Sequence, residues 1–194
     1  MHFQIILCFV AFFISVVQAK PIVMDLPGSI HNDCLNKRNA EIEGAVNKEI
    51  FKVPRILNVG NEIIVTGLMK DGHTVLTVNL MAANEEGKPD HFNVACQVRL
   101  DFPSDTSTKD MITFNTIVNG ARKEVDEGMQ ATELFIDNNF TMKFTMNTKN
   151  RIGLNLKESA AIQDCESELG MEAIQYLTVG GDVHKVEQLS FVLG

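Results

Sequence analysis

The segment HFNVACQVRLDF, residues 91–102, alternates between apolar and polar side chains. Successive side chains of a strand point to opposite faces, so the pattern predicts a strand with one apolar face. The other face would present an amide, a guanidinium and a carboxylate, from Gln97, Arg99 and Asp101. Amide and guanidinium groups suit hydroxyls and carboxylates. The row could therefore hold a polar ligand, or it could be a solvated face whose Arg–Asp pair contributes about 0–1 kcal/mol.

A second group that could do chemistry is the run of carboxylates Glu124, Asp126 and Glu127. Two carboxylates on one strand face could serve as nucleophile and acid of a retaining glycosidase, which places them about 5–5.5 Å apart. Sandwich glycosidases use Glu-x-Asp-x-Glu, but the fifth position here is Gly128. A cleft without Trp would also hold sugar poorly. We keep the glycosidase as a minor alternative and expect a solvated strand or loop.

No pattern in the rest of the chain indicates catalysis or a metal site. The histidines His31, His73, His91 and His184 stand far apart and in no ligand spacing. No Ser or Cys has the flanking residues of a nucleophile elbow. We therefore expect a protein that is not an enzyme and that uses no cofactor and no metal.

The first nineteen residues carry no charged side chain and contain an apolar run from Ile5 to Val17. This run is shorter than the roughly 20 apolar residues that span a bilayer. It ends in Val17-Gln18-Ala19, which resembles a small-x-small cleavage site. We predict a signal peptide over 1–19 and a secreted, extracellular product without stable membrane insertion. If the segment were not cleaved, it would become an N-terminal anchor.

The overall charge argues against nucleic acid as a partner. The chain has 25 acidic and 17 basic residues, a formal net charge of −8, and its charges are scattered. A protein that binds a phosphate backbone needs a basic stripe, and none is present.

Three cysteines remain after Cys8 leaves with the signal peptide: Cys34, Cys96 and Cys165. They are too few and too widely spaced for a disulfide scaffold or a zinc knuckle. Cys96 falls on the apolar face of the strand 91–102, so we expect a buried thiol. In an oxidising compartment the expected bridge is then Cys34–Cys165. A free thiol or an intermolecular bond is the alternative, because pairing needs Cα atoms within about 7 Å.

The residues Asn139-Phe140-Thr141 form an N-glycosylation sequon. In an exported protein Asn139 is therefore a candidate for glycan attachment. The sequon begins a predicted strand, and burial there would prevent the modification.

Most of the chain after residue 50 reads as short strands separated by Asn, Gly and Asp turns. Phe140, Met142, Phe144 and Met146, for example, alternate with polar residues. Such strands describe an antiparallel sandwich or barrel, so we predict an all-β domain over 50–194. Residues 20–49 show no strand pattern and are expected to form an N-terminal extension, while 157–173 are polar and alanine-rich enough for a helical insertion.

Taken in order, the strands resemble the galectin domain, a two-sheet antiparallel β-sandwich of the concanavalin-like jelly-roll type. The resemblance covers roughly residues 51–192. It rests on GNEIIVTGLMKDGHTVLTVNL, on NNFTMKFTMNTKNRIGLNL and on IQYLTVGGDVHKVEQLSFV, in which a Gly-Asp turn precedes the last strand. The family binds glycans and glycoproteins and is not enzymatic.

The resemblance also implies which residues would contact a sugar. In galectins one strand reads apolar-His-apolar-Asn-Pro-Arg-Phe, and its His, Asn and Arg bind galactose hydroxyls. Aligning Phe102 with the closing Phe places Gln97, Arg99 and Asp101 at those positions, and all three differ. The letters His91-Phe92-Asn93 offer another alignment, but Val-Ala-Cys follows instead of Pro-Arg, and the distance to the next strand becomes too long.

Four further residues come from the following strands. The Asn of the next strand is retained as Asn115. The strand after that supplies a Trp, a Glu and sometimes an Arg in galectins. Here Arg122 stands at the Trp position, with Glu124 and Glu127 near the acidic and basic positions.

These differences predict that binding of ordinary β-galactosides is weakened or lost. The chain has no Trp to stack on the sugar, and an acid replaces the guanidinium. Each lost partner leaves polar groups unpaired at about 1–3 kcal/mol, against the ~4 kcal/mol of a millimolar ligand. We therefore expect a lectin of altered specificity, or a protein-interaction or structural module that has kept only the scaffold.

Overall fold

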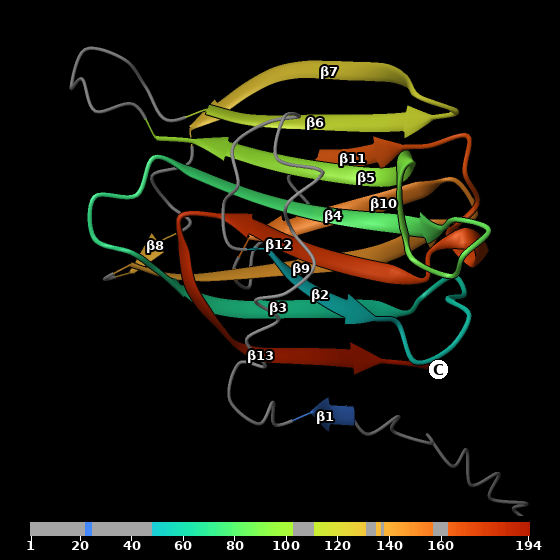
Figure 1. Cartoon of the computed structure of the whole chain (residues 1–194), viewed down its shortest axis with the longest axis horizontal. Helices are drawn as coiled ribbons and strands as arrows, with labels where there is room; N and C mark the ends of the chain where they lie inside the picture. The colour runs from blue at the N-terminus through green and yellow to red at the C-terminus, as the bar shows by residue number, and fades with distance from the viewer. Residues whose placement is uncertain (1–21, 25–47, 103–110, 131–134, 137, 157–162) are drawn as a thin grey trace, which may run out of the picture.

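A computed structural model of the 194-residue chain shows two antiparallel β-sheets packed face to face (Figure 1). The structure describes residues 22–24, 48–102, 111–130, 135–136, 138–156 and 163–194. The predicted signal peptide, most of the predicted N-terminal extension and Cys34 lie outside these ranges. Within them, no helix has the length and apolarity needed to cross a membrane.

The six-stranded sheet has the strand order β2-β12-β4-β5-β6-β7. All five neighbouring pairs run antiparallel. The strands are β2 (Glu49–Lys52), β12 (Tyr176–Gly181), β4 (Val75–Ala83), β5 (Pro89–Asp101), β6 (Met111–Val118) and β7 (Ala121–Gln130).

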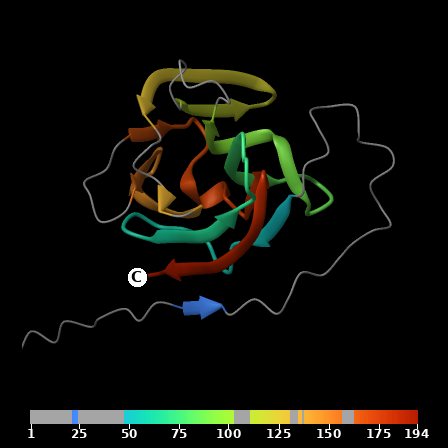
Figure 2. The same cartoon turned by 90° about the vertical axis from the view of Figure 1, so that its left-hand side faces the viewer.

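The seven-stranded sheet has the order β1-β13-β3-β9-β10-β11, with β8 paired to β9. Figure 2 shows the two sheets from the side, with β1 alongside the outer edge of β13. The strands are β1 (Ile22–Met24), β13 (Val183–Val192), β3 (Glu62–Met69), β9 (Asn139–Thr148), β10 (Arg151–Leu156), β11 (Gln163–Glu166) and β8 (Phe135–Ile136). The predicted two-sheet sandwich is confirmed.

The hydrophobic core lies between the sheets and follows the alternation seen in the sequence. Along β9 the apolar side chains from Phe140 to Met146 are fully buried, and the residues between them are partly exposed. On β5, Cys96, Val98 and Leu100 are likewise buried. The first two residues of the stripe predicted for β5 depart from it: Phe92 is 68% exposed, and Val94 is buried but does not belong to the core between the sheets.

The disulfide joins Cys96 of β5 to Cys165 of β11, with the two Cα atoms 5.5 Å apart. The prediction of a Cys34–Cys165 bridge and a free thiol at Cys96 is therefore wrong, although Cys96 is buried as expected. The physical reason is that Cys165 lies on a strand whose inward face meets β5 across the core, and not on an exposed loop or helix. The bond links the two sheets covalently.

The helical insertion predicted over 157–173 is also wrong where the structure describes it. Residues 163–166 form β11, which pairs with β10, and only Met171–Ala173 form a single turn of 3-10 helix. Pairing with the edge of β10 and burial of Cys165 outweigh the helical composition of this segment. Near the other end, Ile22–Met24 pair with β13, so the N-terminal extension contributes one strand.

The Gly-Asp turn between β12 and β13 is held by one carboxylate. Asp182 Oδ2 accepts hydrogen bonds from Thr74 N at 2.7 Å, Thr74 Oγ1 at 2.8 Å and Val75 N at 3.3 Å. Hydrogen bonds from Thr74 lower the pKa of Asp182, because they favour the charged form. The turn thereby ties the start of β13 to the start of β4.

Candidate functional site

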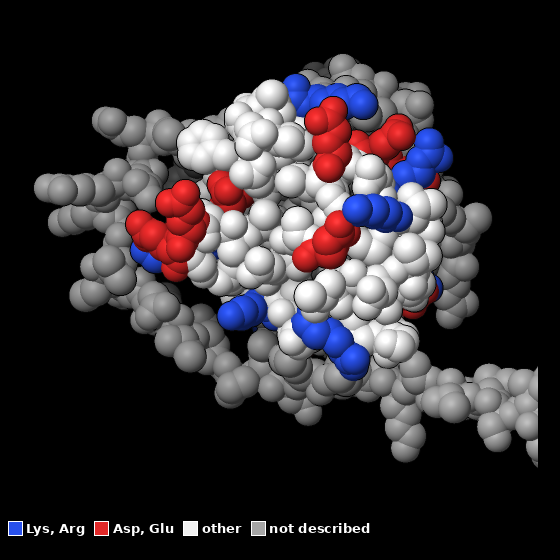
Figure 3. Space-filling model, turned by 90° about the vertical axis from the view of Figure 1, so that its right-hand side faces the viewer, with Lys and Arg blue, Asp and Glu red and all other residues white. Residues whose placement is uncertain are grey.

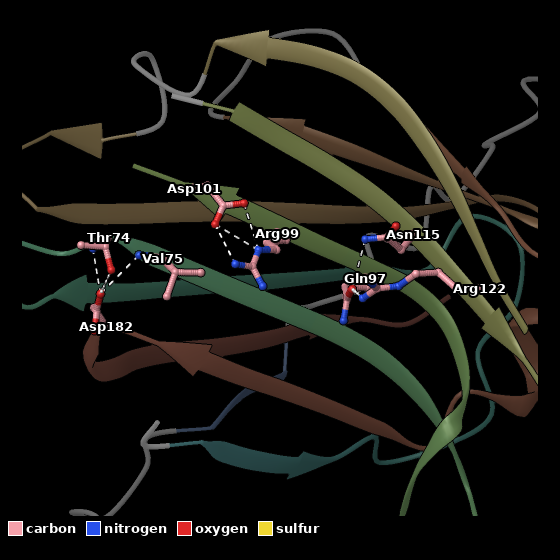
Figure 4. Close-up of polar contacts among 8 residues, drawn as sticks. All are labelled: Thr74, Val75, Gln97, Arg99, Asp101, Asn115, Arg122 and Asp182. Atoms are coloured by element: carbon pink, nitrogen blue, oxygen red, sulfur yellow. Dashed lines mark hydrogen bonds and ion pairs between the residues drawn. The ribbon is translucent and has the colours of Figure 1, made fainter. Parts of the chain in front are cut away.

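Gln97 is the centre of a hydrogen-bond network on the outer face of the six-stranded sheet (Figure 4). Its Oε1 accepts hydrogen bonds from Asn115 Nδ2 at 3.1 Å and from Arg122 Nη2 at 2.9 Å. These residues come from three adjacent strands, because Gln97 of β5 is directly opposite Asn115 of β6 and Arg122 lies on β7. The structure thus brings together three of the residues that the resemblance placed in a sugar site.

The network continues in the other direction to two residues that the sequence analysis missed. Gln97 Nε2 donates to Asn79 Oδ1 at 2.8 Å, and Asn79 Nδ2 donates to Thr178 Oγ1 at 2.9 Å. Both partners are buried and lie opposite each other on β4 and β12. The available signal was an Asn within a largely apolar strand, VLTVNL. The polar row therefore crosses five strands, from β12 to β7, and a hydrogen bond fixes each step.

Asn115 carries a polar atom that the described residues leave unpaired. Its side chain is only 2% exposed, and its Oδ1 has no hydrogen-bond partner among them. An unpaired buried acceptor costs about 1–3 kcal/mol, and such atoms are uncommon in native proteins. Asn115 is therefore held through its Nδ2, which bonds Gln97, and its Oδ1 lies buried beneath this face.

Arg99 and Asp101 bind each other in the two-pronged geometry shown in Figure 4. Arg99 Nε donates to both carboxylate oxygens of Asp101, at 3.0 and 2.9 Å, and Nη2 donates to Oδ1 at 2.9 Å. The two side chains are 43% and 42% exposed, so the pair adds little stability. Their charges therefore offset each other on this face.

The remaining predicted site residues are placed as follows. The backbone of Glu124 lies opposite Asn115, but its side chain, like that of Glu127, is outside the described part of the structure. Asn139 is exposed at the start of β9, in the other sheet, and its use as a glycan site stays a prediction. Within the described ranges no three His, Cys, Asp or Glu side chains gather as a metal site would require.

Charges of both signs are mixed on the side of the molecule that Figure 3 shows. Neither the blue nor the red side chains form a continuous patch there. This distribution agrees with the scattered charges of the sequence.

The architecture defines the class of protein, a two-sheet β-sandwich of the galectin type. No protein-family model and no curated protein matches the sequence. Among solved structures, the chain is similar to CG-16, a homodimeric agglutinin from chicken liver, with a TM-score of 0.53 and 17% identity over 75% of this chain and 99% of that one. Sheep galectin-11 in complex with glycerol gives a TM-score of 0.57 and 15% identity over 75% and 97% of the two chains. Xenopus laevis galectin-Ib gives a TM-score of 0.58 and 12% identity, over 75% of this chain and 99% of that one. At such identities the similarity establishes the fold, and the chain is galectin-like in that sense.

Proposed function

We propose that the protein is a secreted, non-enzymatic lectin that binds a glycan on the outer face of the six-stranded sheet. The observation that carries the proposal is the row from Thr178 through Asn79 and Gln97 to Asn115 and Arg122. A row of fixed amide and guanidinium groups is suited to hydroxyls, and a fixed site loses little entropy on binding. The same strands of the same fold carry the sugar-binding residues of galectins.

The chemistry of this face favours a ligand other than a simple β-galactoside. Arg122 occupies the position of the stacking Trp and is held by Gln97. Asp101 replaces the family's Arg and is paired with Arg99. A galactose hydroxyl that needs a donor at that position would meet a carboxylate instead, and this mismatch lowers affinity.

A glycan array probed with the mature protein, residues 20–194, tests the proposal. We expect binding to one class of glycan, with lactose weaker than about 1 mM. Replacing Gln97 or Arg122 with Ala should weaken that binding about 10- to 100-fold. Each variant removes a polar group that would contact the glycan, and it also breaks the bond between Gln97 and Arg122 that holds the other group in place. Circular dichroism melting curves should confirm that both variants fold.

Matched controls come from the other sheet. Gln188→Ala removes an exposed amide that bonds Ser190, and Arg151→Ala removes a half-exposed guanidinium that faces Glu166. Both variants should bind like the wild type. If no glycan is bound, or if the controls lose as much affinity as Gln97→Ala, the lectin proposal is wrong.

The second candidate function is a protein-interaction or structural module on the same scaffold. It is favoured by the Arg99–Asp101 pair, because these two side chains bond each other and not a sugar hydroxyl. An array without binding, together with a protein partner recovered by pull-down and lost in Gln97→Ala, would support it. Turnover of a chromogenic glycoside would instead indicate the glycosidase.

Secretion is supported by the disulfide between Cys96 and Cys165, because such bonds form and persist in oxidising compartments. We expect protein recovered from the medium of expressing cells to begin at Lys20.

Because Asn139 is exposed, we also expect a glycan there that a peptide-N-glycosidase removes. The loss of mass on treatment with that enzyme measures the glycan, and N-terminal sequencing shows where the secreted protein begins. A product retained in cells with Met1 intact would contradict secretion.

A further inference from the structure

The strand β5 rises out of its sheet beside the polar row. Pro89 pairs with Ala83 of β4 and Val94 pairs with Met81, so five steps along β5 correspond to two steps along β4. The surplus forms an excursion over residues 90–93. Bulges of this kind re-aim side chains and are frequent next to binding sites.

Four hydrogen bonds hold the excursion in place. The Asp90 carboxylate accepts from Phe92 N at 2.9 Å and from Asn93 Nδ2 at 2.8 Å. The turn between β6 and β7 contributes the other two bonds. Gly120 N donates to Phe92 O at 2.9 Å, and Asn119 N donates to Asn93 Oδ1 at 3.0 Å. The backbone on both sides of Phe92 is therefore fixed before any ligand arrives.

The excursion presents the aromatic ring of Phe92 to solvent. With 68% of its surface exposed, Phe92 is the most exposed of the large apolar side chains that the structure describes. The ring lies against Gly120, where an added Cβ would be 3.2 Å from its Cδ1. Because the backbone that carries this ring is already fixed, little backbone entropy is lost when the ring binds a ligand.

Phe92 stands at one end of the face that carries Gln97. Val94 pairs with Ile117, and Ile117 lies two residues from Asn115 and opposite Arg122, so these side chains share one face. Val94 is buried but does not belong to the core between the sheets, as expected for an outward residue. Phe92 lies beside the end of this face, because its ring and its backbone meet Gly120, in the turn that joins the strands of Ile117 and Arg122.

The distance along this face sets the size of the ligand. Gly120 bonds the backbone of Phe92, and the turn that contains it begins about four residues beyond Asn115 on β6. Four residues of a strand cover roughly 13 Å, which is longer than one pyranose ring. Arg122 lies opposite Ile117, between Phe92 at one end of this face and Asn115 at the other, and it bonds Gln97.

We infer that Phe92 is the apolar platform of the site and that the ligand is an oligosaccharide of at least two rings. One ring is bound by Gln97 and Arg122, and the C–H face of another stacks on Phe92. The excursion of β5 thus supplies the aromatic surface that the position of Arg122 lacks. This inference rests on the proposed lectin function.

The test is an array of immobilised mono-, di- and tetrasaccharides probed with four variants: Phe92→Ala, Phe92→Trp, Gln97→Ala and Ile56→Ala. We expect Phe92→Ala to weaken binding to the longer glycans about 5- to 10-fold, and Phe92→Trp to retain it. Ile56 is 64% exposed and outside the site, so Ile56→Ala should bind like the wild type. An exposed ring contributes little to folding, which keeps Phe92→Ala interpretable.

Two outcomes overturn the inference, and they differ in what they say of the proposed function. If Phe92→Ala binds like the wild type while Gln97→Ala does not, the platform is wrong and the lectin proposal stands. If the wild type binds no glycan, both are wrong.

Discussion

Replacing both Cys96 and Cys165 with Ala is expected to lower the free energy of unfolding by about 4 kcal/mol. The bond closes a loop with a sequence separation of 69 and joins β5 of one sheet to β11 of the other. Without it, the unfolded chain regains the conformations that a cross-link of this span removes. For a domain of this size the loss corresponds to a melting temperature lower by roughly 10–15 °C.

Thermal unfolding with and without reductant measures this effect. Reductant should lower the melting temperature of the wild type toward that of the double variant, and it should leave the double variant unchanged. Peptide mapping of the non-reduced protein should recover Cys96 and Cys165 in one cross-linked fragment. A fragment that joins Cys34 to Cys165 instead, or equal melting temperatures, would contradict the cross-sheet bond.

Gly181→Ala is expected to destabilise the protein by about 2–5 kcal/mol, because two penalties coincide there. Gly181 has a φ of +98°, which L-residues rarely adopt. An added Cβ would also stand 2.3 Å from the carbonyl oxygen of Val75, a backbone atom of the adjacent strand. The strand β12 cannot move away without breaking the bonds that Asp182 makes to Thr74 and Val75.

Gly72→Ala is the matched control for this substitution. Gly72 also has a positive φ, +68°, but an added Cβ would meet no atom within 4 Å. Only the backbone penalty applies, so we expect a loss of about 1–2 kcal/mol. Urea unfolding of both variants separates the two penalties, and equal losses would show that the clash with Val75 is relieved.

The fold could be predicted from sequence because the pattern of each strand is local. The alternation from Phe140 to Met146 specifies which face of β9 is buried, and the structure agrees. The same reasoning failed at Phe92, because a bulge changes the register without leaving a mark in the alternation of side chains. One extra residue is enough to move an apolar side chain from the core to the surface.

Features that depend on contacts distant in sequence were harder to predict. The partner of Cys165 depends on which strands face each other, and no cysteine spacing encodes this. The bonds of Asn79 to Gln97 and Thr178 likewise require three strands to be aligned. For the site itself, the resemblance brought Gln97, Asn115 and Arg122 to one face, whereas the hydrogen bonds that join these three side chains emerged only from the structure.

We propose that a glycan binds over Gln97 on the outer face of the six-stranded sheet. The most direct measurement is a titration of the ¹⁵N-labelled mature protein with the tightest glycan from the array, followed by NMR. We predict that the side-chain amide signals of Gln97, Asn115 and Asn79 shift, while that of Asn155 in β10 does not. Shifts centred on Asn155, or none at a saturating glycan concentration, would contradict the claim.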